Sequence, residues 1–361
     1  MISLPFLTGR KNVVGLDLGS SYVKILELQQ NRNKYTLSSF GIQKLPPEAI
    51  VDGAFMNTNV ILEVIRELLA KHKIRTRDVV TSVSGHSVII KKISLPQMTQ
   101  EELEESIQWE AEQYIPFNIE DVNLDVQILN RQADDSGQMD VLLVAAKKEM
   151  IGDYTSLLSQ AGLNPMIIDV DAFAVENMFE VNYDDIDPNA TVVLVNIGAS
   201  IININVLRNK QTSFTRDISM GGNQYTEEIQ KQLSVSYEEA ESLKIGGDLM
   251  GETQSVVPQE VERILGGVSE NVATEIQRSL DFYSATSTED KIARVYLSGG
   301  SALIPGLPQL IEARTGVPVE IANPFRRIEV PEKVLKGAFL PQIAPLAAVA
   351  IGLGLRRVGD K

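Results

Sequence analysis

The sequence contains no cysteine and only two histidines in 361 residues. The lack of cysteine excludes disulfides, thiolate nucleophiles and cysteine metal sites, and it fits a reducing cytoplasm. His72 and His86 each stand alone in the sequence, and we expect both at the surface. Neither a histidine metal site nor a Ser-His-Asp triad is therefore indicated.

Positive charge is also scarce, because 33 lysines and arginines stand against 48 aspartates and glutamates, for a formal net charge of −15. General binding to nucleic acid or to anionic lipid is disfavoured, since phosphate contacts need clustered Lys and Arg. A local nucleotide site remains compatible with this charge, because Mg²⁺ and backbone dipoles supply the compensation there.

Long hydrophobic runs are missing as well. Residues 1–11 are too short and too weakly apolar for a signal peptide. The apolar run 339–355 is broken by two prolines and a glutamine, and it is too short to span a bilayer comfortably. We expect it to be a core helix followed by Arg356 and Arg357, and we expect no direct membrane insertion.

One stretch organises the rest of the chain. Residues 13–28, VVGLDLGSSYVKILEL, read as two apolar strands joined by the turn Gly19, Ser20 and Ser21. The turn offers backbone N–H groups and hydroxyls in one concavity, which suits phosphate. Asp17 could hold Mg²⁺ directly or through water, and Lys24 would add a positive charge. Taken alone, this pattern is equally typical of an ordinary structural hairpin.

The chain then repeats the pattern. Residues 192–207, VVLVNIGASIININVL, align with the first copy without a gap, so the second turn is Gly198, Ala199 and Ser200. Each copy continues into a third strand-like run, at 34–40 and 211–217. Two copies far apart in one chain indicate two similar half-domains whose turns face each other. Two facing turns can grip a polyphosphate from both sides, which favours nucleotide binding.

Hydrophobic periodicity predicts the other elements. A helix over 57–72 and a strand over 79–85 complete a first α/β half, and a helix over 171–180 leads to a crossing between the halves. Between them we expect a compact α+β insert with strands at 87–96, 122–130, 139–146 and 163–172, and helices at 99–115 and 148–161. After the second hairpin we expect helices at 223–232, 238–244 and 261–286.

Trp109 is the only tryptophan and lies on the predicted 99–115 helix. Core packing is the favoured interpretation, because aromatic side chains are commonly buried. The alternative is an anchor for a partner, together with Ile115, Pro116 and Phe117.

Two pairs in the second half offer further groups to a ligand. Gly221 and Gly222 precede a helix N-terminus and can bring backbone N–H groups against an anion. Glu241 and Lys244 are three residues apart and share one helix face, where a solvated charge pair is the plainer interpretation.

The run 295–307, VYLSGGSALIPGL, contains a Gly-Gly turn, and Gly299 and Gly300 leave no side chain between the backbone and a flat base. This run resembles the adenosine motif of the actin, Hsp70 and sugar-kinase superfamily, and GLDLGSSYVK and VNIGASIININV resemble its two phosphate motifs. Within the superfamily the chain resembles the bacterial PilM and FtsA families, and WEAEQYIPF at 109–117 is similar to the PilM family of type IV pilus assembly. The resemblance covers nearly the whole chain.

This resemblance implies a two-domain, actin-like α/β fold with an inserted α+β subdomain, named 1C. It assigns subdomain 1A to 12–84, completed by about 170–189 and 346–361, and subdomain 1C to 85–169. It assigns subdomain 2A to 190–220 and 288–345, and subdomain 2B to 221–287. ATP and Mg²⁺ would lie in the cleft between the halves.

The resemblance also implies roles for residues of this chain. The implied nucleotide-binding residues are Gly19, Ser20, Ser21, Lys24, Gly198, Ala199, Ser200, Gly221, Gly222, Glu241, Lys244, Gly299, Gly300 and Ser301. Among them, Glu241 would meet the ribose hydroxyls and Lys244 the base. Asp17 and Asn196 are the implied Mg²⁺ residues, acting through bound water.

One departure from the superfamily concerns the second hairpin, where an aspartate is usual and this chain has Asn196. An amide carries no charge and cannot act as a base, so we expect weaker metal binding and slower hydrolysis. The sequence assigns no catalytic base. Asp171 and Glu176 lie near the predicted crossing, where surface acids of a helix are the plainer interpretation.

Three function classes remain open. The resemblance favours a cytoplasmic, ATP-binding scaffold of type IV pilus assembly and twitching motility, recruited to the inner membrane by the N-terminal cytoplasmic peptide of PilN. It allows contacts with other pilus proteins and self-association. The second class is a cycling ATPase that polymerises like FtsA. The third, a small-molecule kinase, is disfavoured because no long substrate-binding insert is present.

Overall fold

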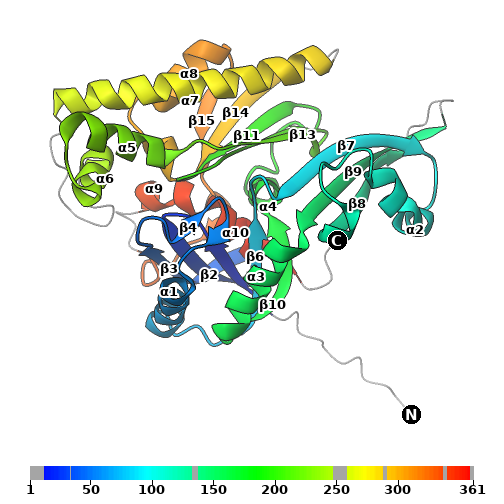
Figure 1. Ribbon diagram of the computed structural model, residues 1–361, viewed down its shortest axis with the longest axis horizontal. Helices are drawn as coiled ribbons and strands as arrows, with labels where there is room; N and C mark the ends of the chain where they lie inside the picture. Colours follow the sequence, from blue (N-terminus) through cyan, green and yellow to red (C-terminus); the bar gives the residue numbers. More distant parts are fainter. Residues whose placement is uncertain are drawn as a thin grey trace.

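A computed structural model describes residues 12–32, 34–131, 137–246, 258–287, 291–335 and 340–357. Two sheets, each begun by one copy of the repeated hairpin, form the two halves of the molecule, and a smaller sheet stands to one side (Figure 1). The repeated pattern thus predicts the architecture correctly.

The sheet of the first half has six strands in the order β10-β6-β1-β2-β3-β16. Its strands are β1 (Val14–Leu18), β2 (Tyr22–Asn31), β3 (Lys34–Lys44), β6 (Asp78–Val83), β10 (Asn164–Val170) and β16 (Ile328–Glu329). Helices α1 (Thr58–Lys71) and α3 (Lys148–Gln160) contribute to the core on one face. Helices α4 (Asp171–Asn182) and α10 (Ala348–Leu355) share the core on the other face with residues of the second sheet. A short hairpin, β4 (Ile50–Val51) and β5 (Ala54–Phe55), precedes α1.

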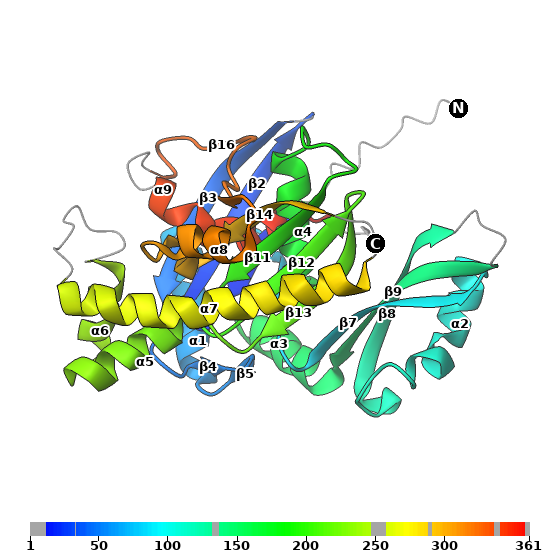
Figure 2. The ribbon, with the colours of Figure 1, turned by 90° about the horizontal axis from the view of Figure 1, so that it is seen from above.

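The sheet of the second half has five strands in the order β13-β12-β11-β14-β15. They are β11 (Thr191–Ile197), β12 (Ile202–Arg208), β13 (Gln211–Ile218), β14 (Ile292–Ser298) and β15 (Val319–Ile321). The helices of this half are α5 (Gly222–Leu233), α6 (Tyr237–Ile245), α7 (Gln259–Thr286) and α8 (Leu307–Thr315). The long helix α7 runs across the outer side of the sheet (Figure 2), where its apolar face joins the core of this half.

The separate sheet consists of β7 (Val88–Pro96), β8 (Val122–Arg131) and β9 (Gln138–Lys147), in the order β7-β9-β8. It is accompanied by α2 (Gln100–Ala111) and has its own apolar core. The predicted capping box is present, since the N–H of Thr99 donates to Glu102 and the N–H of Glu102 donates to Thr99 Oγ1. The helix ends at Ala111, four residues before the predicted end.

The insert differs from the predicted range 85–169 at its C-terminal side. Strand β10 pairs in parallel with β6 and is therefore the edge of the first sheet. Helix α3 buries Met150, Leu157 and Leu158 in the core that α1 shares. Periodicity detects these elements but carries no information about which sheet they join. The strand β16 departs similarly from the range 288–345, because it pairs with β3 of the first half.

Trp109 is 79% exposed, so the interpretation as a core residue is wrong. The buried face of α2 is made by Leu103, Ile107 and Ala111. Trp109 lies two residues after Ile107, which places it on the opposite side of the helix. His86 is exposed as expected, whereas His72 is half-buried and its burial lowers its pKa.

The C-terminal apolar run forms a core helix, as predicted, while residues 336–339 lie outside the described part. It is built from α9 (Leu340–Ile343), a 3₁₀ turn at Pro345–Ala347, and α10, all eight residues of which are buried. At Gly352 a Cβ atom would lie 1.7 Å from the carbonyl oxygen of Ala174, so α10 and α4 touch through their backbones. Across the described ranges, no helix has both the length and the apolar character needed to cross a membrane.

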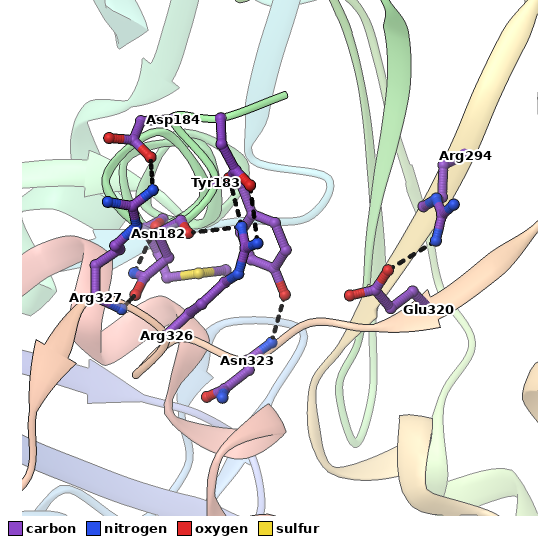
Figure 3. Close-up of polar contacts among 10 residues, drawn as sticks. Asn182, Tyr183, Asp184, Arg294, Glu320, Asn323, Arg326 and Arg327 are labelled. Atoms are coloured by element: carbon purple, nitrogen blue, oxygen red, sulfur yellow. Dashed lines mark hydrogen bonds and ion pairs between the residues drawn. The ribbon is translucent and has the colours of Figure 1, made fainter. Parts of the chain in front are cut away.

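Two segments connect the halves, one after α4 and one after β15, and they are bonded to each other (Figure 3). Arg326 pairs with both carboxylate oxygens of Asp185, at 2.5 and 2.9 Å. The N–H of Asn323 donates to the Tyr183 hydroxyl at 2.9 Å, and the N–H of Arg327 donates to Asn182 Oδ1 at 2.9 Å. The two crossings therefore form one braced connection between the halves.

Candidate functional site

A cavity of about 430 Å³ lies where the turns of the two hairpins meet. Cavities that bind small molecules commonly have volumes of this size. The predicted residues that line it are Asp17, Gly19, Ser20, Ser21, Lys24, Asn196, Gly198, Ala199, Ser200, Gly222, Glu241, Lys244, Gly299, Gly300 and Ser301. Residues that are far apart in the sequence are thus brought to one place.

The first hairpin brings a charged pair to the cavity. Asp17 and Lys24 are directly opposite each other on β1 and β2, and Lys24 Nζ lies 2.9 Å from Asp17 Oδ2. Their side chains are only 10% and 13% exposed, respectively. The lysine and the carboxylate therefore neutralise each other beside the turn.

Of the predicted pair Gly221 and Gly222, only Gly222 lines the cavity, and its N–H braces the second turn. The N–H of Gly222 donates to the carbonyl of Gly198 at 2.9 Å, and the N–H of Asn223 donates to Ala199 at 2.8 Å. A Cβ atom at Gly221 would lie 2.5 Å from the Gly198 oxygen, and Gly221 does not line the cavity. These groups brace the second turn, so the N–H groups of Gly222 and Asn223 are already engaged.

Glu241 and Lys244 share one face of α6, as predicted, but they are not a solvated surface pair. Glu241 is 6% exposed, and its carboxylate contacts both Lys244 and the Thr226 hydroxyl. Lys244 Nζ also donates to Thr226 Oγ1 at 2.8 Å and to the carbonyl of Gly222 at 3.2 Å. Burial lowers the pKa of Lys244, while Glu241 opposes that change.

The Gly-Gly turn forms a smooth part of the wall. Gly299 has φ of +85°, and a Cβ atom there would lie 2.3 Å from the carbonyl oxygen of Ile197, so glycine is required. Beyond the turn the cavity is lined by Leu303, Ile304 and Leu346. An apolar wall beside exposed backbone suits a flat aromatic base.

Asp171 was expected to be a surface acid, and this expectation is wrong. It lines the cavity, and the hydroxyl of Ser82 donates to its Oδ1 at 2.5 Å. Burial, and then the negative charge of Asp17, raise its pKa to about 6. Ser82 and Asp171 lie at the carboxyl ends of neighbouring parallel strands, so the pairing of β10 with β6 brings them together at the cavity.

Glu176 is not a surface acid either. It accepts hydrogen bonds from Thr212 Oγ1 at 2.6 Å and from Asn205 Nδ2 at 2.9 Å. Burial raises its pKa to about 7. These bonds connect α4 to the second sheet. Glu176 does not line the cavity, so it is not a candidate for chemistry there.

The oxygen groups of the cavity fit a Mg²⁺ ion that takes most of its coordinating oxygens from a bound ligand and from water. In the part of the chain that is described, no three His, Cys, Asp or Glu side chains are close enough to hold a metal on their own. Asp17 and Asp171 are nevertheless near enough for their charges to oppose each other, which a cation would relieve. Mg²⁺ commonly takes one or two carboxylates, with phosphate and water oxygens filling the other positions.

Comparison with known proteins identifies the relatives of this chain. A family model described as type IV pilus assembly protein PilM matches residues 15–358. The structure of a PilM-PilN type IV pilus biogenesis complex matches 97% of this chain and 100% of that chain, with 30% identity and a TM-score of 0.85.

More distant relatives share the fold. The cell division protein FtsA of Streptococcus pneumoniae is 21% identical over 352 residues, which is 86% of this chain and 75% of that protein. MreB5 of Spiroplasma citri bound to AMPPNP is 12% identical, with a TM-score of 0.51 over 95% of this chain and 94% of that chain. The fold is therefore the actin-like fold, and the chain belongs to the PilM family of type IV pilus assembly proteins.

Proposed function

We propose that this protein binds Mg²⁺-ATP in the cavity between its halves and serves pilus assembly as a nucleotide-dependent scaffold. The observation that carries the proposal is the meeting of both hairpin turns, one from each half, at one cavity of suitable volume. A ligand held by both turns is bound best when the halves are close together. ATP would thereby set the closure of the cleft.

The lining residues divide by the part of ATP that they suit. The two turns, Gly19–Ser21 and Gly198–Ser200, would hold the phosphates, with Lys24 adding charge. Glu241 and Lys244 would bind the ribose and base beside the Gly299–Gly300 turn. Mg²⁺ would neutralise phosphate charge, with Asp17 and Asn196 acting through its bound water. The structure of the actin-like protein MreB5 bound to AMPPNP supports a nucleotide as the ligand.

Slow ATP hydrolysis is a second candidate activity, and Asp171 is the observation that favours it. A carboxyl group inside the cavity with a pKa raised to about 6 is mostly ionised at neutral pH, and it is a stronger base than an ordinary aspartate, so it can accept a proton from water. Asn196 stands where a second carboxylate would strengthen metal binding, so we expect hydrolysis to be slow.

The proposed partner is the N-terminal cytoplasmic segment of PilN. The support is the similarity to a PilM that is in complex with PilN. We propose a cytoplasmic protein that is held at the inner membrane through this partner. Cell fractionation with and without the PilN N-terminal segment tests the proposal, and equal membrane recovery in both strains would remove PilN as the recruiting partner.

Calorimetry with a Gly198→Val variant tests the nucleotide site. A Cβ atom at Gly198 would lie 2.9 Å from the backbone oxygen of Ile201, so valine displaces the second turn. We expect a loss of ATP affinity of at least about tenfold, or about 1.4 kcal/mol. Gly152→Val is the matched control, because a Cβ atom there has no neighbour within 4 Å. Unchanged affinity in a folded Gly198→Val protein would contradict the proposed site.

A further inference from the structure

A row of polar side chains crosses three strands of the second half, beginning at the cavity. Asn196 on β11 is opposite Asn203 on β12, and Asn203 is opposite Asp217 on β13. Asn196 Nδ2 donates to Asn203 Oδ1 at 3.1 Å, and Asn203 Nδ2 donates to Asp217 Oδ1 at 2.8 Å. The row ends outside the second half, where the N–H of Gly85 donates to Asp217 Oδ2 at 2.7 Å.

The chemistry of Asp217 determines the direction of every bond in this row. An ionised carboxylate only accepts hydrogen bonds, so Asn203 must present its NH₂ group to Asp217. The carbonyl oxygen of Asn203 then faces Asn196, which must in turn present its own NH₂ group. The carbonyl oxygen of Asn196 is thereby left on the side of Ser298, whose hydroxyl lies 3.2 Å away.

Within the described ranges, the other side-chain hydrogen bond of Asn196 is with Ser298, and it does not set this orientation. The Ser298 hydroxyl can donate or accept, so it tolerates either end of the Asn196 amide. Asn203 is only 3% exposed and lies between Asn196 and Asp217, so water does not satisfy its amide if that amide is reversed. An amide turned the wrong way would leave two donors or two acceptors facing each other, which is costly in a buried place.

We propose that Asp217 and Asn203 are positioning residues that hold the Asn196 side chain with its carbonyl oxygen, and not its NH₂ group, available to water bound to Mg²⁺. The inference rests on the proposed function, because it concerns how Asn196 would contact water bound to Mg²⁺ at that site. It also explains how the neutral amide of Asn196 would accept a hydrogen bond from metal-bound water. Both ends of a carboxylate accept hydrogen bonds, whereas an amide must be held with its oxygen toward the water.

In the variant Asp217→Asn, we expect the amides of Asn203 and Asn196 to turn round, so that the hydrogen bond between them reverses its direction. The N–H of Gly85 attracts the oxygen of the new amide, whose NH₂ group then faces Asn203 and turns it round. Asn203 now donates to the Asn196 oxygen, and the Asn196 NH₂ group takes the place of its oxygen. That group cannot accept a hydrogen bond from a water on Mg²⁺.

Calorimetry of ATP binding with Mg²⁺ and with EDTA measures the consequence. In Asp217→Asn we expect the gain in ATP affinity that Mg²⁺ confers to fall roughly tenfold, as is typical for outer-shell partners of metals. Affinity in EDTA should be unchanged, which separates this effect from damage to the fold. An undiminished Mg²⁺ gain would overturn the proposal.

The double variant Asp217→Asn with Asn203→Asp provides the rescue. The new carboxylate at position 203 accepts from both neighbours, so Asn196 again offers its oxygen, and the net charge equals that of the natural protein. We expect most of the Mg²⁺ gain to return. A double variant no better than Asp217→Asn alone would overturn the proposal.

A second measurement does not depend on ATP. In the natural protein the side-chain NH₂ protons of Asn196 should exchange slowly by NMR, since they are bonded to Asn203. They should exchange rapidly in Asp217→Asn and slowly again in the double variant. Equal exchange in all three proteins would overturn the orientation argument, whereas failure of the natural protein to bind ATP would overturn only the proposed function.

Discussion

The two hairpins have the same register but differ in the chemistry that they bring to the cavity. Asp17 faces Lys24 in the first, and Asn196 faces Asn203 in the second. The first hairpin compensates its charge with the opposite charge, while the second avoids charge beside the cavity and places its carboxylate, Asp217, at the far end of a row. Two copies of one backbone pattern thus satisfy their polar groups beside the cavity in different ways, the first with an ion pair and the second with oriented amide dipoles.

Breaking the ion pair gives the largest expected effect. Lys24→Met leaves the carboxylate of Asp17 nearly buried without a partner, so the free energy of unfolding should fall by about 3 kcal/mol. Urea unfolding measures the change. The double variant Asp17→Asn with Lys24→Met makes the first hairpin neutral like the second and should lose much less. Equal losses in both variants would show that the loss of stability does not come from the unpaired carboxylate of Asp17.

A second difference between the hairpins concerns Asn205, which aligns with Leu26 in the repeat. The side-chain NH₂ group of Asn205 donates a hydrogen bond to the carboxylate of Glu176. Burial raises the pKa of Glu176 to about 7 from its ordinary 4.5, so the folded protein binds the proton more tightly than the unfolded chain does. Stability should therefore fall as pH rises from about 4.5 to 7, by on the order of 2 kcal/mol from this group. Glu176→Gln should remove that part of the slope in thermal unfolding, whereas the exposed Glu227→Gln should retain it.

Asn196→Asp sharpens the comparison by giving the second hairpin the carboxylate of the first. We expect Mg²⁺ affinity in the presence of ATP to rise roughly tenfold, about 1.4 kcal/mol, and ATP turnover to increase. The gain is limited because the new carboxylate faces the Asn203 oxygen, which Asp217 holds in place. Calorimetry and phosphate release measure the two effects. No change in either would place Asn196 outside the surroundings of the metal.

Trp109→Ala gives the smallest expected effect and serves as a reference outside both hairpins. Its side chain is 79% exposed, so the free energy of unfolding should change by no more than about 0.5 kcal/mol. Ile107→Ala on the buried face of the same helix should cost about 3 kcal/mol. Similar losses for both variants in urea unfolding would mean that Trp109 is covered in solution.

The comparison also shows what the sequence can reveal. The hairpins, their turns and the cavity are predictable, because apolar alternation and Gly/Ser turns are local signals that the repeat doubles. The place of β10 is not, since pairing with β6 depends on contacts more than 80 residues apart in the chain. The place of Asp171 in the cavity was missed for the same reason. The Asn203–Asp217 bond joins neighbouring strands and was missed because it depends on the exact register of β12 against β13, and the Gly222 N–H could not be known to be engaged before the Gly198 carbonyl was placed.

The burial of α10 in the first half bears on how the chain folds during synthesis. Strand β1 near the N-terminus packs on α10, where Gly15 and Gly354 come into close contact, and β16 adds a further late strand to the same sheet. The first half can be completed only after residue 355 has left the ribosome, whereas strands β11 to β15 of the second half are contiguous in sequence order between 191 and 321. Domains form as units during translation when their contacts are available. The half that is translated first is therefore the half that is finished last.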